Sequence, residues 1–336
     1  MDTKIITWFL IAIGLIIVFL FLWIIVSYKI WKKRIIKRLE LESSIVETSL
    51  GSIEYLLIGQ GPVVLMSHGG PGGYDQGYLL EDLTREGFSV LAPSRPGYLK
   101  TPLAVGRTYE EQADAFAALL DTLNIEKVAA IVGFSAGGPT ALQFAIRHPS
   151  RCATLIMESG VSMRYEPPDK AEDTFWGRVF LSSGLQDLMS WILSVFTNRT
   201  PGAALKSMLK IESTFESKVI SQKVDEVMKS PLHVQWFKAL IRTTVPMSKR
   251  RAGLDNDIEK LRELPQYPLE RITIPTLVMH SRYDNDAKWE NAEFVKATIP
   301  NVELYEVDAC GHLLWIGADA ERVHKKRVEF LKKKRL

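Results

Sequence analysis

Cysteine is scarce in this sequence, and its scarcity excludes one class of fold. The 336 residues include two cysteines, Cys152 and Cys310, too few for a scaffold held together by disulfide bonds. The chain also lacks the glycine repeat of collagen and the low apolar content of a disordered protein, since 46% of its residues are hydrophobic. What remains is a globular protein with enough chain to bury a core of one or two domains.

The chain also lacks a large excess of charge of either sign, because 42 Lys+Arg nearly balance 39 Asp+Glu. The small excess is local: residues 1–38 hold seven basic residues and one acid, which leaves residues 39–336 with a net charge of −3. Nucleic-acid-binding domains carry basic surface patches. The main body of this chain therefore gives no support to a nucleic-acid partner.

One long apolar run stands at the N-terminus, where residues 5–28 contain no charged side chain. At about 1.5 Å per residue, a helix over this run spans the roughly 30 Å hydrocarbon core of a bilayer. A cleaved signal peptide is the main alternative, but it has a shorter apolar region and ends in small residues, which Val26-Ser27-Tyr28 does not provide. We predict a single transmembrane anchor within residues 1–28 and a basic juxtamembrane linker over residues 29–42.

The charges that flank the apolar run predict its orientation. Residues 29–38 carry six positive charges, whereas the other flank offers Lys4 and the terminal amine against Asp2. Basic flanks favour the cytoplasmic side of a membrane. The rest of the chain is therefore expected in the cytoplasm.

The body alternates short β-branched runs with helical stretches, the pattern of an α/β fold with a mostly parallel sheet. We predict about eight strands, at residues 45–49, 53–58, 63–67, 89–92, 128–132, 153–158, 276–280 and 303–307. The helices expected around them are at residues 77–86, 109–123, 136–147, 289–298 and 320–333. Between the two parts of this core, 43–160 and 272–336, residues 161–271 show helical patterns alone and are predicted to form an inserted cap. Its expected helices are at residues 172–181, 185–196, 201–209, 215–228 and 233–243.

A nucleophile motif follows the predicted strand at 128–132. The sequence Gly133-Phe134-Ser135-Ala136-Gly137 is G-x-S-x-G in the strand–turn–helix context that the motif requires. The sharp turn places the Ser135 hydroxyl in the site, and glycine at both ends lets neighbouring backbone pass. We therefore predict Ser135 as a catalytic nucleophile.

A serine nucleophile needs a base and an acid that orients it. His312 follows the last predicted strand, at the carboxyl edge of the sheet where Ser135 also lies, and is the predicted base. Asp284 follows the strand at 276–280 and gives the chain order Ser, Asp, His. Glu158 and Asp308 are the alternative acids. Asp286 is expected to cap the following helix, and the remaining histidines are expected to be structural.

The same site needs two backbone donors for an oxyanion. Ala136 follows the nucleophile at a helix N-terminus and is the first predicted donor. The second is expected from Gly69 or Gly70, in the sequence His-Gly-Gly-Pro-Gly-Gly at 68–73, where glycine lets the backbone approach a substrate oxygen. His68 is expected to shape this loop. The sequence has no metal-ligand cluster and no dinucleotide loop, so we expect neither a metal nor a cofactor.

Together these residues resemble the α/β-hydrolase fold superfamily over about residues 43–336. The loop at 68–73 resembles that of the proline iminopeptidase group, whose members remove N-terminal proline. That group usually has G-G-S-W-G at the elbow and D-Q-R-G in a later loop, where this chain has Gly133-Phe134-Ser135-Ala136-Gly137 and Ser94-Arg95-Pro96-Gly97. The elbow resembles the esterase, lipase and carbon–carbon hydrolase branches. Epoxide hydrolases and haloalkane dehalogenases carry aspartate in place of Ser135.

The leading hypothesis is a membrane-anchored serine hydrolase that cleaves carboxylic esters, with lipid and acylglycerol esters as candidate substrates. The apolar stretch at 185–196 is either a buried cap helix or a lid that lines an acyl pocket or dips into the bilayer. An aminopeptidase of the proline iminopeptidase kind is the second hypothesis. It needs cap carboxylates for the substrate ammonium, for which Glu172, Asp173, Glu212 and Glu216 are candidates. A non-catalytic binding module is the third.

Overall fold

The body of the molecule is built on one eight-stranded sheet. The computed structural model describes residues 3–166 and 185–333. Its strand order is β1-β2-β4-β3-β5-β6-β7-β8, antiparallel at β1-β2-β4 and parallel from β4 onward. The strands are β1 (Ser44–Thr48), β2 (Gly51–Gly59), β3 (Val63–Ser67), β4 (Ser89–Pro93), β5 (Ala130–Phe134), β6 (Leu155–Glu158), β7 (Thr276–His280) and β8 (Val302–Glu306). This confirms the predicted α/β fold with a mostly parallel sheet.

Helices cover both faces of the sheet, so its central strands are buried on both sides. One apolar layer joins the sheet to α3 (Tyr109–Thr122), α4 (Gly138–Arg147) and α11 (Glu290–Thr298). The other joins it to α2 (Asp82–Arg85) and α12 (Ala320–Lys333). Both cysteines are buried and free.

Two parts of the body differ from expectation. The helix expected at 77–86 is a 3-10 turn, Tyr74–Leu80, followed by the single turn α2. Gly77 lets this turn pack closely on the sheet, because a Cβ there would come within 2.6 Å of the Ala92 side chain. A helix that the pattern did not predict, α10 (Arg251–Arg262), has few apolar positions and is fixed by buried polar contacts of Asp257.

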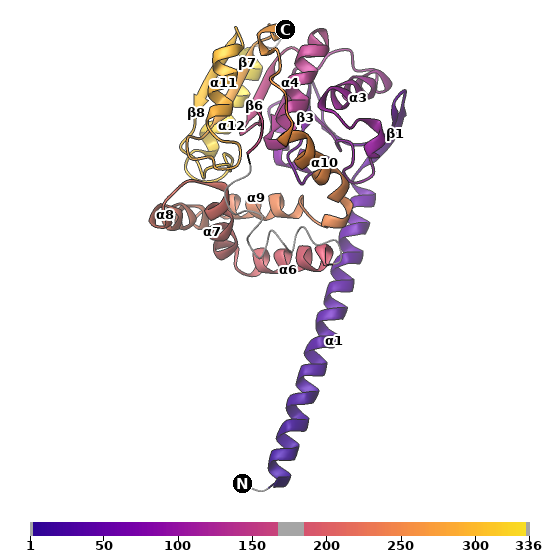
Figure 1. The fold of residues 1–336 in the computed structure, drawn as a ribbon, viewed down its shortest axis with the longest axis vertical. Coiled ribbons are helices and arrows are strands. Elements are labelled where there is room, and N and C mark those ends of the chain that lie inside the picture. The colour runs from indigo at the N-terminus through magenta and orange to yellow at the C-terminus, as the bar shows by residue number, and fades with distance from the viewer. Residues whose placement is uncertain (1–2, 167–184, 334–336) are drawn as a thin grey trace.

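The block at 161–271 forms a separate helical layer. In its described part the structure has α6 (Gln186–Arg199), α7 (Pro201–Glu212), α8 (Ser217–Met228), α9 (Pro231–Arg242) and α10, and no strand beyond an isolated bridge. Residues of α7, α8 and α9 share an apolar cluster with Leu313 and Ile316 of the loop after β8. Figure 1 shows α6 and α9 lying between the sheet and the projecting part of α1. The helix expected at 172–181 lies outside the described residues.

The N-terminal segment is one continuous helix, α1 (Thr3–Leu41), which projects from the body as a shaft (Figure 1). In the described chain it is the one helix long and apolar enough to cross a membrane, and its apolar stretch is exposed. The helix continues through the basic segment after residue 28, where Ile35 and Leu39 become buried. The expected linker is therefore helical and docked on the body.

Candidate active site

The turn after β5 has the geometry of a nucleophile elbow. Ser135 has φ of +47°, a conformation that non-glycine residues rarely adopt. The glycines of the motif are required by packing, because a Cβ on Gly133 would lie 2.8 Å from the Ala141 side chain and one on Gly137 only 2.2 Å from the Ser67 carbonyl. The sequence forms this strained turn because strand β5 and helix α4 fix it on both sides.

The loops after β7 and β8 bring Asp284 and His312 together. Nδ1 of His312 lies 2.9 Å from Oδ2 of Asp284. The other carboxylate oxygen of Asp284 accepts hydrogen bonds of 2.9 Å each from the backbone N–H groups of Asp286 and Ala287. Asp284 thus holds the His312 ring with one oxygen while its own loop holds the other.

The charges of this pair shift both pKa values. Burial by itself would raise the pKa of Asp284, but the His312 imidazole and the hydrogen-bonding His280 hold it at about 2. Burial would lower the pKa of His312, but Asp284 and then Asp286 and Glu212 outweigh that effect and raise it to about 10. A negatively charged Asp284 beside a basic imidazole is the arrangement that orients a general base.

His312 is also fixed through its backbone. Ser159 Oγ donates to the His312 carbonyl at 3.0 Å, and the His312 N–H donates to the Glu212 carbonyl at 3.0 Å. Gly311 precedes it with φ of +65°, and a Cβ there would lie 2.4 Å from the Ser213 side chain. The C-terminal end of α7 is therefore attached to the loop that carries the histidine.

Ser135 lies at the same sheet edge but is not hydrogen-bonded to the histidine. In residues 3–166 and 185–333, no hydrogen bond joins the Ser135 hydroxyl to His312. The free Nε2 of His312 lies 3.7 Å from Oδ2 of Asp286 instead. Contacts between a nucleophile and its base are often long without substrate and tighten when substrate binds.

The loop after β3 runs directly beside Ser135. A Cβ on Gly69 would lie 3.2 Å from the Ser135 Cβ, and one on Gly70 would lie 3.6 Å from the Ala136 Cβ. The Gly69 N–H is already used, because it donates to Oε1 of Gln76 at 2.9 Å. This leaves the Gly70 amide as the candidate donor of the predicted pair, opposite Ala136.

His68 shapes this loop, as the sequence suggested. Its Nε2 accepts the Arg95 N–H at 2.9 Å, and its carbonyl accepts from Arg95 Nε at 2.9 Å. Burial and the neighbouring Arg95 charge keep the pKa of His68 well below its usual value. The Arg95 guanidinium continues into a buried ion pair with Asp257, at 2.6 Å. His68 is thus a neutral hydrogen-bond acceptor in this network.

The alternative acids are occupied elsewhere. Glu158 is fully buried and accepts from Arg327 of α12 at 2.6 and 2.9 Å, and from Trp315 Nε1 at 2.5 Å. Asp308 is exposed and pairs with Lys223. Neither contacts the His312 ring among the described residues, so Asp284 is the acid that the structure brings to the histidine.

Two further carboxylates lie near His312, that of Glu212 in the cap and that of Asp286 in the loop after β7. Glu212, Asp286 and His312 each offer an atom within 4.8 Å of the others, and Oε2 of Glu212 is buried without a partner among the described residues. Burial and then Asp286 raise the pKa of Glu212 to about 8. Three such ligands are a possible cation site, but Nε2 of His312 is the same atom that a general base uses. Of the other cap carboxylates, Glu216 is exposed, and Glu172 and Asp173 lie outside the described residues.

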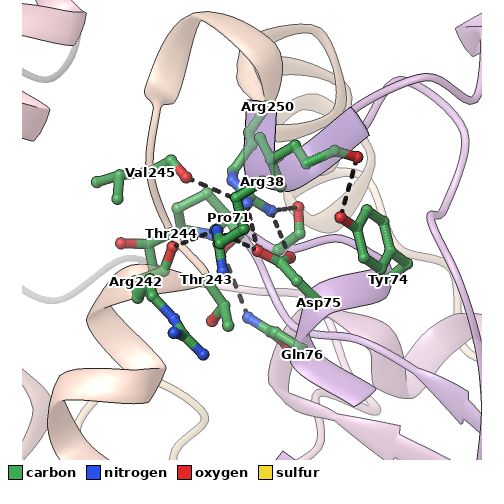
Figure 2. Close-up of polar contacts among 12 residues, drawn as sticks. Arg38, Pro71, Tyr74, Asp75, Gln76, Arg242, Thr243, Thr244, Val245 and Arg250 are labelled. Carbon is green, nitrogen blue, oxygen red and sulfur yellow. Dashed lines mark hydrogen bonds and ion pairs between the residues drawn. The ribbon is translucent and has the colours of Figure 1, made fainter. Parts of the chain in front are cut away.

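Sequence reasoning missed the residues that support the glycine loop. Figure 2 shows Arg38 of α1 and Arg250 converging on Asp75, with Nη2–Oδ2 distances of 3.2 and 2.8 Å. Arg250 also donates to the Gly72 carbonyl at 2.5 Å, and Gln76 follows Asp75 in the chain. No local spacing signals such contacts, since Arg250 and Gly72 are 178 residues apart.

Comparison with known proteins agrees with this geometry. The model of the alpha/beta hydrolase fold matches residues 62–318. A solved α/β hydrolase fold protein from Nakamurella multipartita is 32% identical, with a TM-score of 0.78 over 86% of this chain and 98% of that chain. The chain belongs to the α/β-hydrolase fold family.

Curated relatives are also hydrolases. The uncharacterized hydrolase YcgS of Bacillus subtilis is 27% identical over 272 residues, which cover 80% of this chain and 91% of the relative. The 2-hydroxy-6-oxo-6-phenylhexa-2,4-dienoate hydrolase of Burkholderia cepacia is 27% identical over 276 residues, covering 78% of this chain and 85% of that enzyme. These matches support hydrolase activity and leave the substrate open.

Proposed function

We propose that this protein is a membrane-anchored serine hydrolase that cleaves carboxylic esters through an acyl-enzyme at Ser135. The observation that carries the proposal is the 2.9 Å contact between His312 and Asp284 at the sheet edge where the strained Ser135 elbow lies. A base with an orienting acid, at the sheet edge that also carries a serine, is the requirement for nucleophilic acyl transfer.

The proposed reaction has two steps. His312 Nε2 accepts the Ser135 proton as the serine oxygen attacks the ester carbonyl, and the Gly70 and Ala136 amides donate to the resulting oxyanion. The imidazolium then protonates the leaving alcohol. Water, deprotonated by His312, then attacks the acyl-enzyme, and the imidazolium returns that proton to the Ser135 oxygen as the acid leaves. Asp284 keeps the imidazole oriented and stabilises its charge in both steps.

The anchor and the cap together favour apolar esters. Helix α6 lies against α1, where the Trp191 and Tyr28 ring centroids are 6.3 Å apart, and Lys32 pairs with Asp187 at 2.9 Å. Met189 of α6 is buried, whereas Leu185 and Val195 are exposed. This cap face lies beside the proposed membrane span, where lipid or acylglycerol esters are concentrated. The basic end of the span favours a cytoplasmic location of the body.

A fluorophosphonate probe tests the nucleophile. Wild-type protein should become covalently labelled, and Ser135→Ala should remain folded by circular dichroism and unlabelled. Equal labelling of both proteins contradicts the proposal. The substrate class is then read from the turnover of p-nitrophenyl esters of rising acyl length, with 2-hydroxy-6-oxo-6-phenylhexa-2,4-dienoate, the substrate for which the Burkholderia cepacia relative is named, as the comparison. Faster turnover of the latter would reassign the reaction.

Anchoring is tested on the full chain expressed in cells. Wild-type protein should stay in the membrane pellet after alkaline carbonate, and a form lacking residues 1–28 should not. Protease added to sealed right-side-out vesicles should leave the body intact. Digestion of the body in those vesicles contradicts the cytoplasmic orientation.

One observation favours a second candidate, an aminopeptidase that takes a substrate with a free ammonium. Glu212 presents a buried carboxyl oxygen from the cap that has no partner within residues 3–166 and 185–333, and together with Asp286 it lies beside His312. A carboxylate in that place suits an N-terminal amine. Proline p-nitroanilide and p-nitrophenyl esters should be compared in wild type and Glu212→Gln. Loss of proline turnover with ester turnover kept would establish the aminopeptidase, whereas absence of proline turnover in wild type excludes it.

A further inference from the structure

A groove separate from the candidate active site lies where the anchor helix meets the cap. It has a volume of about 470 Å³, within the range of small-molecule sites. Its walls come from three helices: α1 contributes Trp31, Arg34 and Arg38, α6 contributes Thr197 and Asn198, and α9 contributes Lys238 and Arg242. These helices are far apart in the sequence, so the groove exists only because α1 docks on the cap.

The charge of this groove is of one sign. Four cations line it, Arg34, Arg38, Lys238 and Arg242, and the lining residues that the structure describes include no carboxylate. Arg38 directs Nη2 to Asp75 at 3.2 Å and Nη1 to Glu42 at 3.8 Å, two carboxylates that are not among the described lining residues. Lys238 contacts one backbone carbonyl, that of Asn198, at 3.3 Å. The groove therefore holds more positive charge than its own walls neutralise.

A buried polar group in the wall also lacks a partner. Thr197 is 2% exposed, lines the groove, and its hydroxyl has no hydrogen-bond partner in the described part of the chain. Buried polar atoms are normally paired, so the unpaired Thr197 hydroxyl, in a wall that also carries guanidinium groups, indicates a missing acceptor. An anion with several oxygens, such as a phosphate, supplies acceptors for both kinds of donor.

The groove lies at a defined distance from the proposed membrane span. The uncharged run ends at Tyr28, and Arg34 is six residues further along the same helix, about 9 Å at 1.5 Å per residue. The headgroup layer beyond the hydrocarbon is about 5–8 Å thick on each side. Trp31, at the groove's edge, is an aromatic residue of the kind enriched at that interface. The Arg34 backbone thus lies just beyond this layer, and its long side chain, which tilts toward the N-terminal end of the helix, can reach back to the lipid phosphates.

We propose that the groove between α1, α6 and α9 binds the phosphate of an anionic phospholipid headgroup. The proposal rests on α1 being the proposed membrane anchor. A lipid is favoured over a free phosphate compound because the groove adjoins the exposed apolar stretch of α1, along which acyl chains can lie. Basic pockets beside membrane helices on the cytoplasmic side suit such headgroups.

Native mass spectrometry of the full-length protein in detergent tests the proposal. The probes are dioleoyl phosphatidylglycerol, dioleoyl phosphatidylcholine and inorganic phosphate, each titrated separately. Wild type should retain one phosphatidylglycerol in preference to phosphatidylcholine. The double variant Arg34→Gln with Lys238→Gln should bind that phosphatidylglycerol about 10- to 30-fold more weakly, since each cation near an anionic surface contributes to lipid affinity.

A matched control removes the same charge elsewhere on the helix. Lys33 and Lys37 are exposed residues of α1 that do not line the groove. Lys33→Gln with Lys37→Gln should keep wild-type affinity. Equal loss in this control means diffuse attraction to anionic lipid and overturns the site. Equal affinity of wild type for the two lipids overturns it as well, and so does displacement of the lipid by millimolar inorganic phosphate.

The proposed function is read out separately on the same preparations. Fluorophosphonate labelling reports the serine hydrolase, and its failure leaves the lipid titration interpretable. Carbonate extraction reports the anchor, and release of wild type would remove the basis of the lipid site. Each failure therefore identifies which proposal is wrong.

Discussion

Arg38, near the end of the anchor helix, forms an ion pair with Asp75, with an Nη2–Oδ2 distance of 3.2 Å (Figure 2). Gln76 follows Asp75 in the chain. Gln76 in turn accepts the Gly69 N–H of the loop beside Ser135. The helix proposed to cross the membrane is thus connected through two neighbouring residues to the loop that carries the candidate oxyanion donor. We infer that the end of α1 is part of the catalytic body.

The first prediction concerns this connection. Deleting residues 1–28 should leave ester turnover in detergent nearly unchanged, whereas deleting residues 1–42 should lower it at least tenfold and lower the melting temperature. Arg38→Ala in the full chain should cost about 1–3 kcal/mol of unfolding free energy, less than a fully orphaned buried charge because Arg250 still pairs with Asp75. Lys37→Ala, an exposed neighbour, is the control. Equal activity of the two deletions would contradict the connection.

The second prediction is the pH dependence of activity. With its pKa raised to about 10 by Asp284, Asp286 and Glu212 against the effect of burial, His312 is protonated at neutral pH and becomes a free base as pH rises. The value of kcat/KM should therefore climb with pH toward about 10. Asp286→Asn removes one negative neighbour, so its rising limb should move to lower pH. Initial rates over pH 6–11 measure this shift, and an unchanged limb would disprove the role of Asp286.

The same pKa carries a consequence for stability. A pKa that is higher in the folded state means that protonated His312 stabilises the fold. That contribution is fully present below the unfolded value near 6.5 and is lost as pH rises through about 10. Urea unfolding of wild type against His312→Gln should show a difference that shrinks between pH 7 and pH 10.

The third prediction separates the two buried acids. Asp284→Asn should reduce kcat by about 10⁴-fold because it turns the imidazole to the wrong tautomer, and it should also lower stability at neutral pH by removing the charge that keeps His312 protonated. Glu158→Gln should cost about 3 kcal/mol or more of unfolding free energy, since it leaves the Arg327 guanidinium without its buried partner. Denaturant unfolding and single-turnover acylation, measured on both variants, distinguish these effects. A stable but inactive Glu158→Gln would reverse the assignment.

The fourth prediction concerns Gln76. Gln76→Leu removes the acceptor of the Gly69 N–H and should loosen the loop that presents Gly70. A misplaced oxyanion donor costs less than a deleted one, so kcat should fall about 10- to 100-fold. The pH at which activity rises should not change, because His312 keeps its neighbours. Gln76→Glu retains an acceptor and should recover part of the rate, and failure of both variants to affect kcat would exclude this role.

The sequence was sufficient for the parts of the fold and site that depend on local patterns. The elbow at Ser135 and the loop positions of Asp284 and His312 follow from strand endings and motif spacing, and the strands at β3 and β7 have the expected bounds. The apolar periodicity did not predict helix α10, because polar side chains dominate this helix and buried contacts of Asp257 hold it in place. The contacts of Asp75 with Arg38 and Arg250 were not predicted, because they join segments that are distant in the chain and no sequence periodicity relates such segments.

Helix α1 runs without a break from its exposed apolar stretch to the buried Leu39. An unbroken helix transmits rotation as well as position, since each residue adds about 100° of turn and about 1.5 Å of height. One residue inserted near Ser27 would therefore rotate the body, and with it the candidate active site, by about 100° around the helix axis. Four inserted residues would return it to nearly the same side, about 6 Å further from the membrane. The number of residues between the span and the body thus sets the direction in which the candidate active site faces around the axis of α1.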